Sequence, residues 1–139
     1  MIKKFLYIFI SLFLFNNLFA KSEYFKKGIV LYNENKFEDA KFKFEQDIVF
    51  NPKSEISYLY LSKIFHKQDK KNLEEKNLNT VMLLNPLNEE AIYSLAILKL
   101  RSSDYKKSRE LNKKLKAVCS KFCSKSDKLK IEIENLSKK

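Results

Sequence analysis

The segments FNPKSEISYLYLS (residues 50–62) and LNPLNEEAIYSLA (residues 84–96) decide the fold of this chain. Each contains an Asn-Pro dipeptide, and the two dipeptides lie 34 residues apart. The large residues Tyr58 and Ile92 follow at the same spacing, and so do the small residues Ser62 and Ala96. A fixed period of this length indicates a repeated unit of supersecondary structure.

The same spacing extends through most of the chain. Further pairs in this phase, one or two periods apart, are Tyr24 with Tyr58, Gly28 with Ser62, Phe37 with Tyr105, Ala40 with Ser108, and Phe44 with Leu78. So many coincidences in a single phase are not expected by chance. We therefore interpret the chain as an array of similar units.

Each unit reads as two helices. Apolar residues recur at helical spacing within 22–33 and again within 37–50, and only the short polar stretch from Asn33 to Lys36 separates them, which favours an antiparallel pair. A small residue such as Gly28 would let the two helices approach where the large Phe44 must fit. Proline ends each pair, because it cannot continue a helix. The expected helices are 22–33, 37–50, 54–67, 71–84, 88–101, 105–118 and 123–137, with Asn88 and Asp104 as N-terminal caps.

These residues resemble the tetratricopeptide repeat family, whose unit of 34 residues combines large, small, aromatic and alanine positions with a closing proline. The residues that match are Tyr24, Gly28, Phe37, Ala40, Phe44 and Pro52 in the first unit, Tyr58, Leu61, Ser62, Phe65, Leu78 and Pro86 in the second, and Ile92, Leu95, Ala96, Tyr105 and Ser108 in the third. The departures are Asp47, Lys71, Glu74, Asn112 and Ser120; Glu74, for example, stands where the family prefers alanine.

The resemblance implies an all-α fold: an α-solenoid of about three antiparallel helical hairpins followed by a capping helix. The units would be residues 21–54, 55–88 and 89–122, and residues 123–139 would form the capping helix and a basic tail. An exported bacterial member of the family is expected.

The resemblance also implies a binding groove, because the first helix of each unit lines the concave face in this family. The matching positions are Phe25, Ile29, Tyr32, Leu59, Lys63, His66, Tyr93, Ile97 and Arg101. Such a surface suits an amphipathic helix or an extended peptide. Some of these residues could instead face the core or the capping helix. Members that bind a C-terminal carboxylate have Lys and Asn where this chain has Phe25 and Ile29, so that variant is not expected.

The first twenty residues predict export. Lys3 and Lys4 precede an uncharged run from Phe5 to Phe15, and Ala20 ends a region suited to cleavage. This layout is typical of a secretory signal peptide, although Leu18 stands where a small residue is preferred. We expect a protein of the bacterial periplasm, with a retained N-terminal membrane anchor as the alternative.

The net charge of +11 is concentrated near the C-terminus. Residues 21–100 carry 13 Lys or Arg and 12 Asp or Glu, whereas residues 101–139 carry 13 and 5. The basic residues are Lys106, Lys107, Arg109, Lys113, Lys114, Lys116, Lys121, Lys125, Lys128 and Lys130. They predict either a solvated face or contact with anionic lipid or an acidic partner. The expected compartment and the few arginines argue against nucleic acid.

Cys119 and Cys123 fall near the turn between the sixth and seventh expected helices. An exported chain meets an oxidising environment, so a structural disulfide is expected. Free or intermolecular thiols, or a metal- or redox-linked accessory protein that works through this pair, are the alternatives. A zinc site is not expected, because zinc takes four ligands and His66 is the only histidine.

No catalytic motif is recognisable. Ser62, His66 and Asp69 lie within one short helical stretch that lacks an oxyanion hole and a nucleophile elbow. Gly28 is the only glycine, which excludes a glycine-rich phosphate loop. The sequence therefore predicts a protein-interaction adaptor without a cofactor, not an enzyme.

Overall fold

The computed structural model of the chain describes residues 22–138, and these residues form seven α-helices and no strand. The helices are α2 (Glu23–Asn33), α3 (Phe37–Phe50), α4 (Glu55–Lys67), α5 (Lys71–Leu84), α6 (Glu89–Arg101), α7 (Tyr105–Val118) and α8 (Cys123–Leu136). Each predicted helix agrees with an observed one to within one residue at either end. The predicted signal peptide, residues 1–20, lies outside the described residues.

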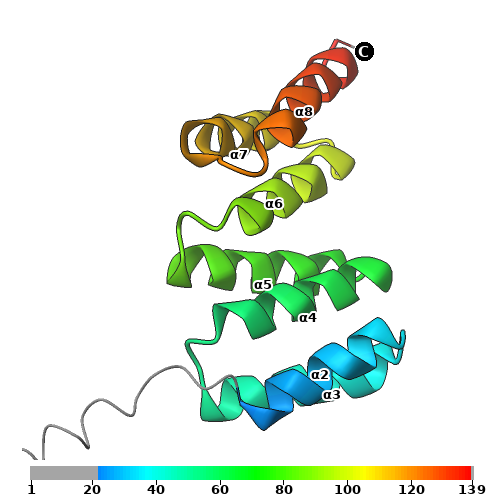
Figure 1. The fold of residues 1–139 in the computed structure, drawn as a ribbon. Helices are drawn as coiled ribbons and strands as arrows, with labels where there is room; N and C mark the ends of the chain where they lie inside the picture. Colours follow the sequence, from blue (N-terminus) through cyan, green and yellow to red (C-terminus); the bar gives the residue numbers. More distant parts are fainter. Residues whose placement is uncertain (1–21, 139) are drawn as a thin grey trace, which may run out of the picture.

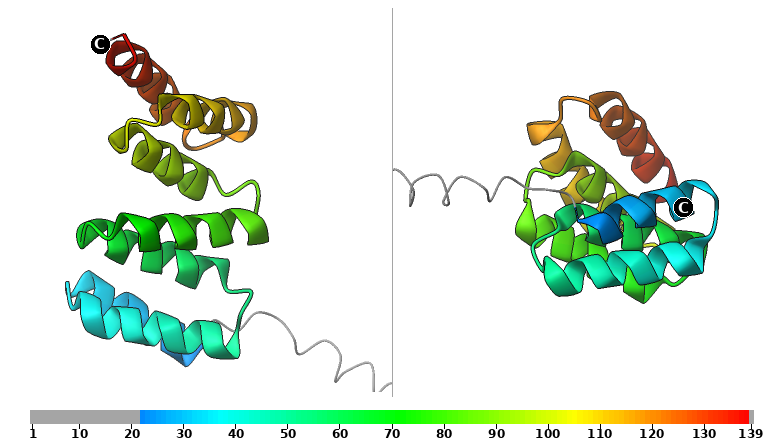
Figure 2. Two further views of the ribbon diagram at one scale, coloured as in Figure 1. Left: turned by 180° about the vertical axis from the view of Figure 1, so that it is seen from behind. Right: turned by 60° about the horizontal axis from the view of Figure 1, so that its bottom comes forward.

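The helices pair into three hairpins, α2 with α3, α4 with α5 and α6 with α7. Figure 1 shows the hairpins stacked along one axis, with α8 at the C-terminal end, and the right panel of Figure 2 shows that successive hairpins are rotated relative to one another. Helix α8 packs against α7 and α6. The predicted all-α solenoid with a capping helix is confirmed.

The turn inside each hairpin has the same backbone geometry. Asn35, Asp69 and Ser103, which are 34 residues apart, have φ values of 60°, 51° and 60°. Asn and Asp tolerate this left-handed region better than most residues do. The amide of the next residue donates to a carbonyl five residues earlier, as from Lys36 to Leu31 at 2.9 Å, which closes the end of the helix.

Helix N-termini carry the predicted caps. The side chain of Asn88 accepts from the amide of Ala91 at 2.9 Å, and that of Asp104 accepts from the amide of Lys107 at 3.0 Å. Helix α2 has a cap that was not predicted, since Ser22 Oγ accepts from the amide of Phe25 at 3.1 Å.

The predicted interlock of small and large residues is present in the first hairpin. A Cβ atom placed on Gly28 would lie 2.7 Å from Cε1 of Phe44, closer than two carbon atoms can pack. Phe44 itself is 0% exposed. In the third hairpin, Ser108 Oγ donates to the carbonyl of Ala96 at 2.8 Å, so the backbone at this small residue is again closely approached.

Two apolar clusters form the core. The first joins the first hairpin to α4 through Phe25, Ala40, Phe44, Leu61, Ile64 and Phe65. The second extends from α4 to α8 and includes Leu59, Leu78, Val81, Ile92, Leu95, Leu98, Leu111, Leu115, Leu129 and Ile133. Because each hairpin buries its apolar side chains against its neighbours, the stack is held by contacts between adjacent units.

Polar departures from the repeat pattern are paired inside the structure. Asp47, which is 1% exposed, accepts hydrogen bonds from the hydroxyls of Ser22 and Ser57. Asn112 Nδ2 donates to the carbonyl of Ser126 at 3.0 Å, and Ser126 Oγ donates back to Asn112 Oδ1 at 2.9 Å. The first set ties α3 to the starts of α2 and α4, and the second ties α7 to α8.

Glu89 holds the turn before α8. Its carboxylate accepts from the hydroxyl of Ser120 at 2.7 Å and from the amides of Ser120, Lys121 and Phe122 at 2.8, 2.9 and 2.8 Å. A disulfide between Cys119 and Cys123 spans the same turn, with Cα atoms 5.3 Å apart. Ser120, which replaces the closing proline of the repeat, is therefore a hydrogen-bond donor to the third hairpin.

Replacing Glu89 by glutamine is expected to destabilise the protein at neutral pH and much less in acid. The hydroxyl of Ser120, together with the amides of Ser120, Phe122 and Lys121, lowers the pKa of Glu89 from 4.5 to about 2. A carboxylate with a lowered pKa stabilises the fold fully above its unfolded-state value, and the contribution is lost as pH falls from about 4.5 towards 2. Thermal melts from pH 7 to pH 2 would measure this.

The difference in melting temperature between the parent chain and Glu89→Gln should be largest at neutral pH and shrink through that acid range. Glu132→Gln, on the exposed surface of α8, is the matched control and should show little difference at any pH. A constant difference for Glu89→Gln across the whole range would contradict the assignment.

Candidate functional site: a pocket on the inner face

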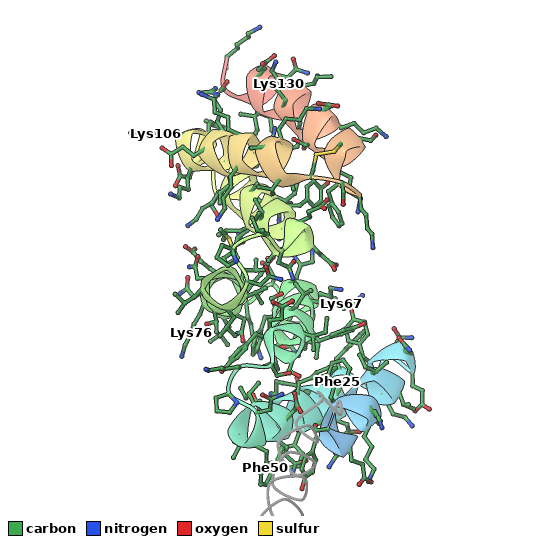
Figure 3. All side chains as sticks on the ribbon, turned by 60° about the vertical axis from the view of Figure 1, so that its left-hand side comes forward. Phe25, Phe50, Lys67, Lys76, Lys106 and Lys130 are labelled. Carbon is green, nitrogen blue, oxygen red and sulfur yellow. A yellow bond between two sulfur atoms is a disulfide. The ribbon has the colours of Figure 1, made fainter. Side chains whose placement is uncertain are left out.

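The first helices of the hairpins share one side of the stack. In Figure 3, α2, α4 and α6 lie on the side where Lys67 is labelled, and α3 and α5 lie on the side of Lys76. On the first side there is a pocket of about 260 Å³, which we call the inner pocket. Its lining residues come from four helices and are Tyr32, Ser62, Lys63, His66, Lys67, Glu74, Glu90, Tyr93, Ser94 and Ile97.

Five of the nine predicted groove residues line this pocket: Tyr32, Lys63, His66, Tyr93 and Ile97. Ile29 is half-buried against the first apolar cluster, and Arg101 is exposed beside His66. Phe25 and Leu59 are 5% and 2% exposed and belong to the two core clusters. In Figure 3, Phe25 lies between the first hairpin and α4. We therefore assign Phe25 and Leu59 to the core, the reading that the sequence had left open.

Aromatic side chains that are held by other rings form two walls of the inner pocket. The ring of Tyr32 lies 5.1 Å from that of Tyr60 and 5.5 Å from that of Phe37, both in edge-on contact. Tyr93 packs against Phe122, with ring centroids 5.6 Å apart. Because each wall is supported from behind, the pocket is pre-formed.

An ion pair crosses the pocket between α4 and α6. Nζ of Lys63 lies 2.8 Å from Oε1 of Glu90 and 4.7 Å from the centre of the Tyr60 ring. Lys67 is directed over the ring of Phe37, with Nζ 5.0 Å from the centroid. Both lysines therefore have partners within the protein.

A buried carboxylate lies on the α5 side of the pocket. Glu74 is 3% exposed, and its Oε1 lies 2.9 Å from Nδ1 of His66. Oε2 has no hydrogen-bond partner among residues 22–138, and the nearby Nη1 of Arg101 is 3.9 Å away. Nη1 of Arg101 also lies 2.9 Å from His66 Nδ1. One oxygen of a buried carboxylate is thus left to accept a further donor.

The Ser62, His66 and Asp69 grouping does not form a relay. Ser62 Oγ donates to the carbonyl of Leu59 at 2.7 Å, and Asp69 accepts from Nη2 of Arg101 at 3.1 Å. His66 contacts Glu74 instead of either residue. These three side chains therefore have separate partners.

Sequence reasoning missed Glu74 and Glu90 as site residues. Glu74 had a visible signal, since it replaces the alanine that the repeat prefers, while the corresponding positions hold Ala40 and Ser108. Glu90 had none, because its partner Lys63 is on a different unit.

A second cleft of about 450 Å³ lies between α7 and α8. It is lined by basic residues of the C-terminal third together with two carboxylates: Arg109, Lys113, Lys116, Lys130, Asp127 and Glu134. Nζ of Lys116 lies 2.7 Å from Oδ1 of Asp127, so part of the positive charge is neutralised within the cleft. Figure 3 shows Lys106 and Lys130 on opposite sides of this end of the stack.

The structure also bears on metals and membranes. Within residues 22–138 there is no group of three or more His, Cys, Asp or Glu side chains that could hold a metal ion. Over the same residues, no helix combines the length and apolar character needed to cross a bilayer. The disulfide between Cys119 and Cys123 agrees with the structural interpretation of the pair.

The sequence matches no protein-family model and no curated protein. The structure is similar to the Yersinia enterocolitica type III secretion chaperone SycD in complex with a peptide of the translocator YopD, with a TM-score of 0.74 and 14% identity over 84% of this chain and 93% of that one. It is also similar to the first TPR of Spaghetti (RPAP3) bound to an HSP90 peptide, with a TM-score of 0.73 and 11% identity over 82% and 90%.

A third similar structure is the Sgt2 TPR domain from Aspergillus fumigatus, with a TM-score of 0.71 and 14% identity over 84% of this chain and 81% of that one. All three similarities extend over most of both chains. The chain therefore has the fold of tetratricopeptide repeat domains.

Proposed function

We propose that this chain is a protein-interaction adaptor that binds a segment of a partner protein on its inner face. The observation that carries the proposal is the inner pocket, whose walls come from consecutive repeats and are pre-formed by ring contacts. A mixed surface of this kind, with apolar walls and fixed charges, suits a peptide segment. The similar structures of SycD and RPAP3 were each solved with a peptide bound.

The proposal includes a compartment. The predicted signal peptide would deliver the chain out of the cytoplasm, with cleavage after Ala20, and a bacterial periplasm is the expected location. The disulfide between Cys119 and Cys123 supports this, because such bonds persist in oxidising compartments. In this proposal the chain has no catalytic role.

Replacing Tyr93 and Ile97 together by alanine is expected to weaken partner recovery about tenfold or more, since buried aromatic anchors dominate such interfaces. Both side chains line the inner pocket and neither is among the fully buried core residues. The measurement is quantitative pull-down of co-purifying proteins with the full chain as bait, accompanied by far-UV circular dichroism.

Leu83→Ala is the matched control, because Leu83 is an apolar side chain that is 81% exposed and lies outside the inner pocket. Its recovery of partners should equal that of the parent chain. Equal recovery by Tyr93→Ala/Ile97→Ala, with helicity retained, would remove the inner pocket from the binding surface.

A further inference from the structure

We infer that the inner pocket receives one large aromatic side chain that carries a hydrogen-bond donor, tyrosine or tryptophan, from the bound segment, and that Glu74 accepts its hydrogen bond. This inference rests on the proposed function, since it names what the inner face recognises.

The size of the pocket points to a single side chain. At about 260 Å³ it is smaller than the roughly 300–1,000 Å³ of clefts that enclose drug-sized ligands. A helix or strand of a partner would therefore lie over the pocket and insert one residue. Tyrosine and tryptophan are the residues most enriched as such anchors.

The walls of the pocket favour an aromatic group. Tyr32 and Tyr93 each present a ring already fixed by neighbouring rings, and Ile97 adds an aliphatic surface. Aromatic rings gain contact energy from offset or edge-on packing against such walls. A small or wholly polar side chain would leave these surfaces uncovered.

Glu74 supplies the polar requirement. A buried carboxylate oxygen that lacks a donor is destabilising, and Oε2 of Glu74 has no hydrogen-bond partner among the described residues. The hairpin itself does not need a carboxylate here, because the equivalent residues Ala40 and Ser108 are small and fully buried. A donor that arrives with the ligand would satisfy this oxygen.

The charges around the pocket favour a neutral donor over a cationic one. The lining lysines Lys63 and Lys67 balance Glu74 and Glu90, and Arg101 adds a positive charge at the edge, 3.9 Å from Oε2 of Glu74. A lysine or arginine of the partner would meet this excess of positive charge. The hydroxyl of tyrosine or the indole N–H of tryptophan would not.

The test begins with selection of peptides from a random display library on the full chain. Peptides are kept if they bind the parent chain and lose binding to the Tyr93→Ala/Ile97→Ala variant, so that they report on the inner pocket. We expect tyrosine or tryptophan to be enriched over phenylalanine at one position. In a selected tyrosine peptide, replacing that residue by phenylalanine should reduce affinity about tenfold, since an unpaired buried acceptor costs about 1–3 kcal/mol.

The same exchange of tyrosine for phenylalanine should change the affinity for Glu74→Ala by less than about twofold, because no acceptor remains. Alanine is the residue the repeat prefers here, and Glu74→Met is a second apolar variant that keeps the bulk. If no pocket-dependent peptide is selected, the proposed function fails. If such peptides are selected without the aromatic preference, or if the exchange affects the parent and Glu74→Ala equally, only this inference fails.

Discussion

Replacing Phe44 by alanine is expected to lower the free energy of unfolding by about 3–5 kcal/mol, the usual cost of removing a buried phenylalanine. Phe44 is 0% exposed, and its ring lies 5.9 Å from that of Phe25 and 5.1 Å from that of Tyr60. It therefore joins both helices of the first hairpin to the second hairpin. Chemical denaturation followed by circular dichroism, with the disulfide intact, would measure the loss.

Gly28 provides the control for this contact. Gly28→Ala should destabilise the parent chain by about 1–2 kcal/mol, because its Cβ would meet a ring that is packed on all sides. In a Phe44→Leu background the clash is removed, and the same change should stabilise by about 0.5–1 kcal/mol through helix propensity. The sign of the Gly28→Ala effect should therefore reverse between the two backgrounds. The same sign in both, or a loss below about 1 kcal/mol for Phe44→Ala, would show that the interlock does not hold the hairpin.

This interlock could be predicted from sequence because it is local and repeated. The 34-residue spacing aligns Gly28 with Ser62 and Phe44 with Leu78, so each unit supports the reading of the others. The caps at Asn88 and Asp104 were predictable for a similar reason, since a cap bonds to an amide three residues away. The fold therefore followed from features contained within one unit.

The candidate site was predicted less completely because burial depends on the neighbouring unit. Phe25 and Ile29 lie one turn apart on α2, yet Phe25 is buried and Ile29 is only partly buried. The period fixes which residues share a face of the first helix, but the stacking of hairpins determines how much of that face is covered. Leu59 was assigned to the groove on the same pattern and is covered in the same way.

The carboxylates of the structure could not be assigned from sequence, because their partners lie in other elements. Glu89 binds the turn at Ser120, 31 residues away, and the side chain of Glu74 meets His66 across a hairpin. A single sequence shows that a charged residue departs from the repeat pattern but does not show its partner. The departures were therefore the right places to look, without a role that could be stated in advance.

The departure at Asp47 leads to the second large expected effect. Ser57→Ala should lower the free energy of unfolding by about 2–4 kcal/mol, because it removes a hydroxyl donor from a buried carboxylate. Asp47 is 1% exposed, and its recorded donors are the hydroxyls of Ser57 and Ser22. Asp47→Ala should cost only about 1 kcal/mol, since it removes the buried charge itself and puts a small residue where the repeat prefers one.

The pair therefore forms a cycle with a counterintuitive order of stabilities. Asp47→Ala/Ser57→Ala should be more stable than Ser57→Ala alone, because removing the carboxylate relieves the missing hydrogen bond. Ser54→Ala is the matched control: Ser54 Oγ donates to Ser57 Oγ at 3.0 Å but is not a recorded donor to the carboxylate, so its loss should be smaller than that of Ser57→Ala. Additive losses in Asp47→Ala/Ser57→Ala, measured by denaturation, would mean that these hydroxyls do not stabilise the charge. The starts of α2 and α4 would then be joined to α3 by apolar packing alone.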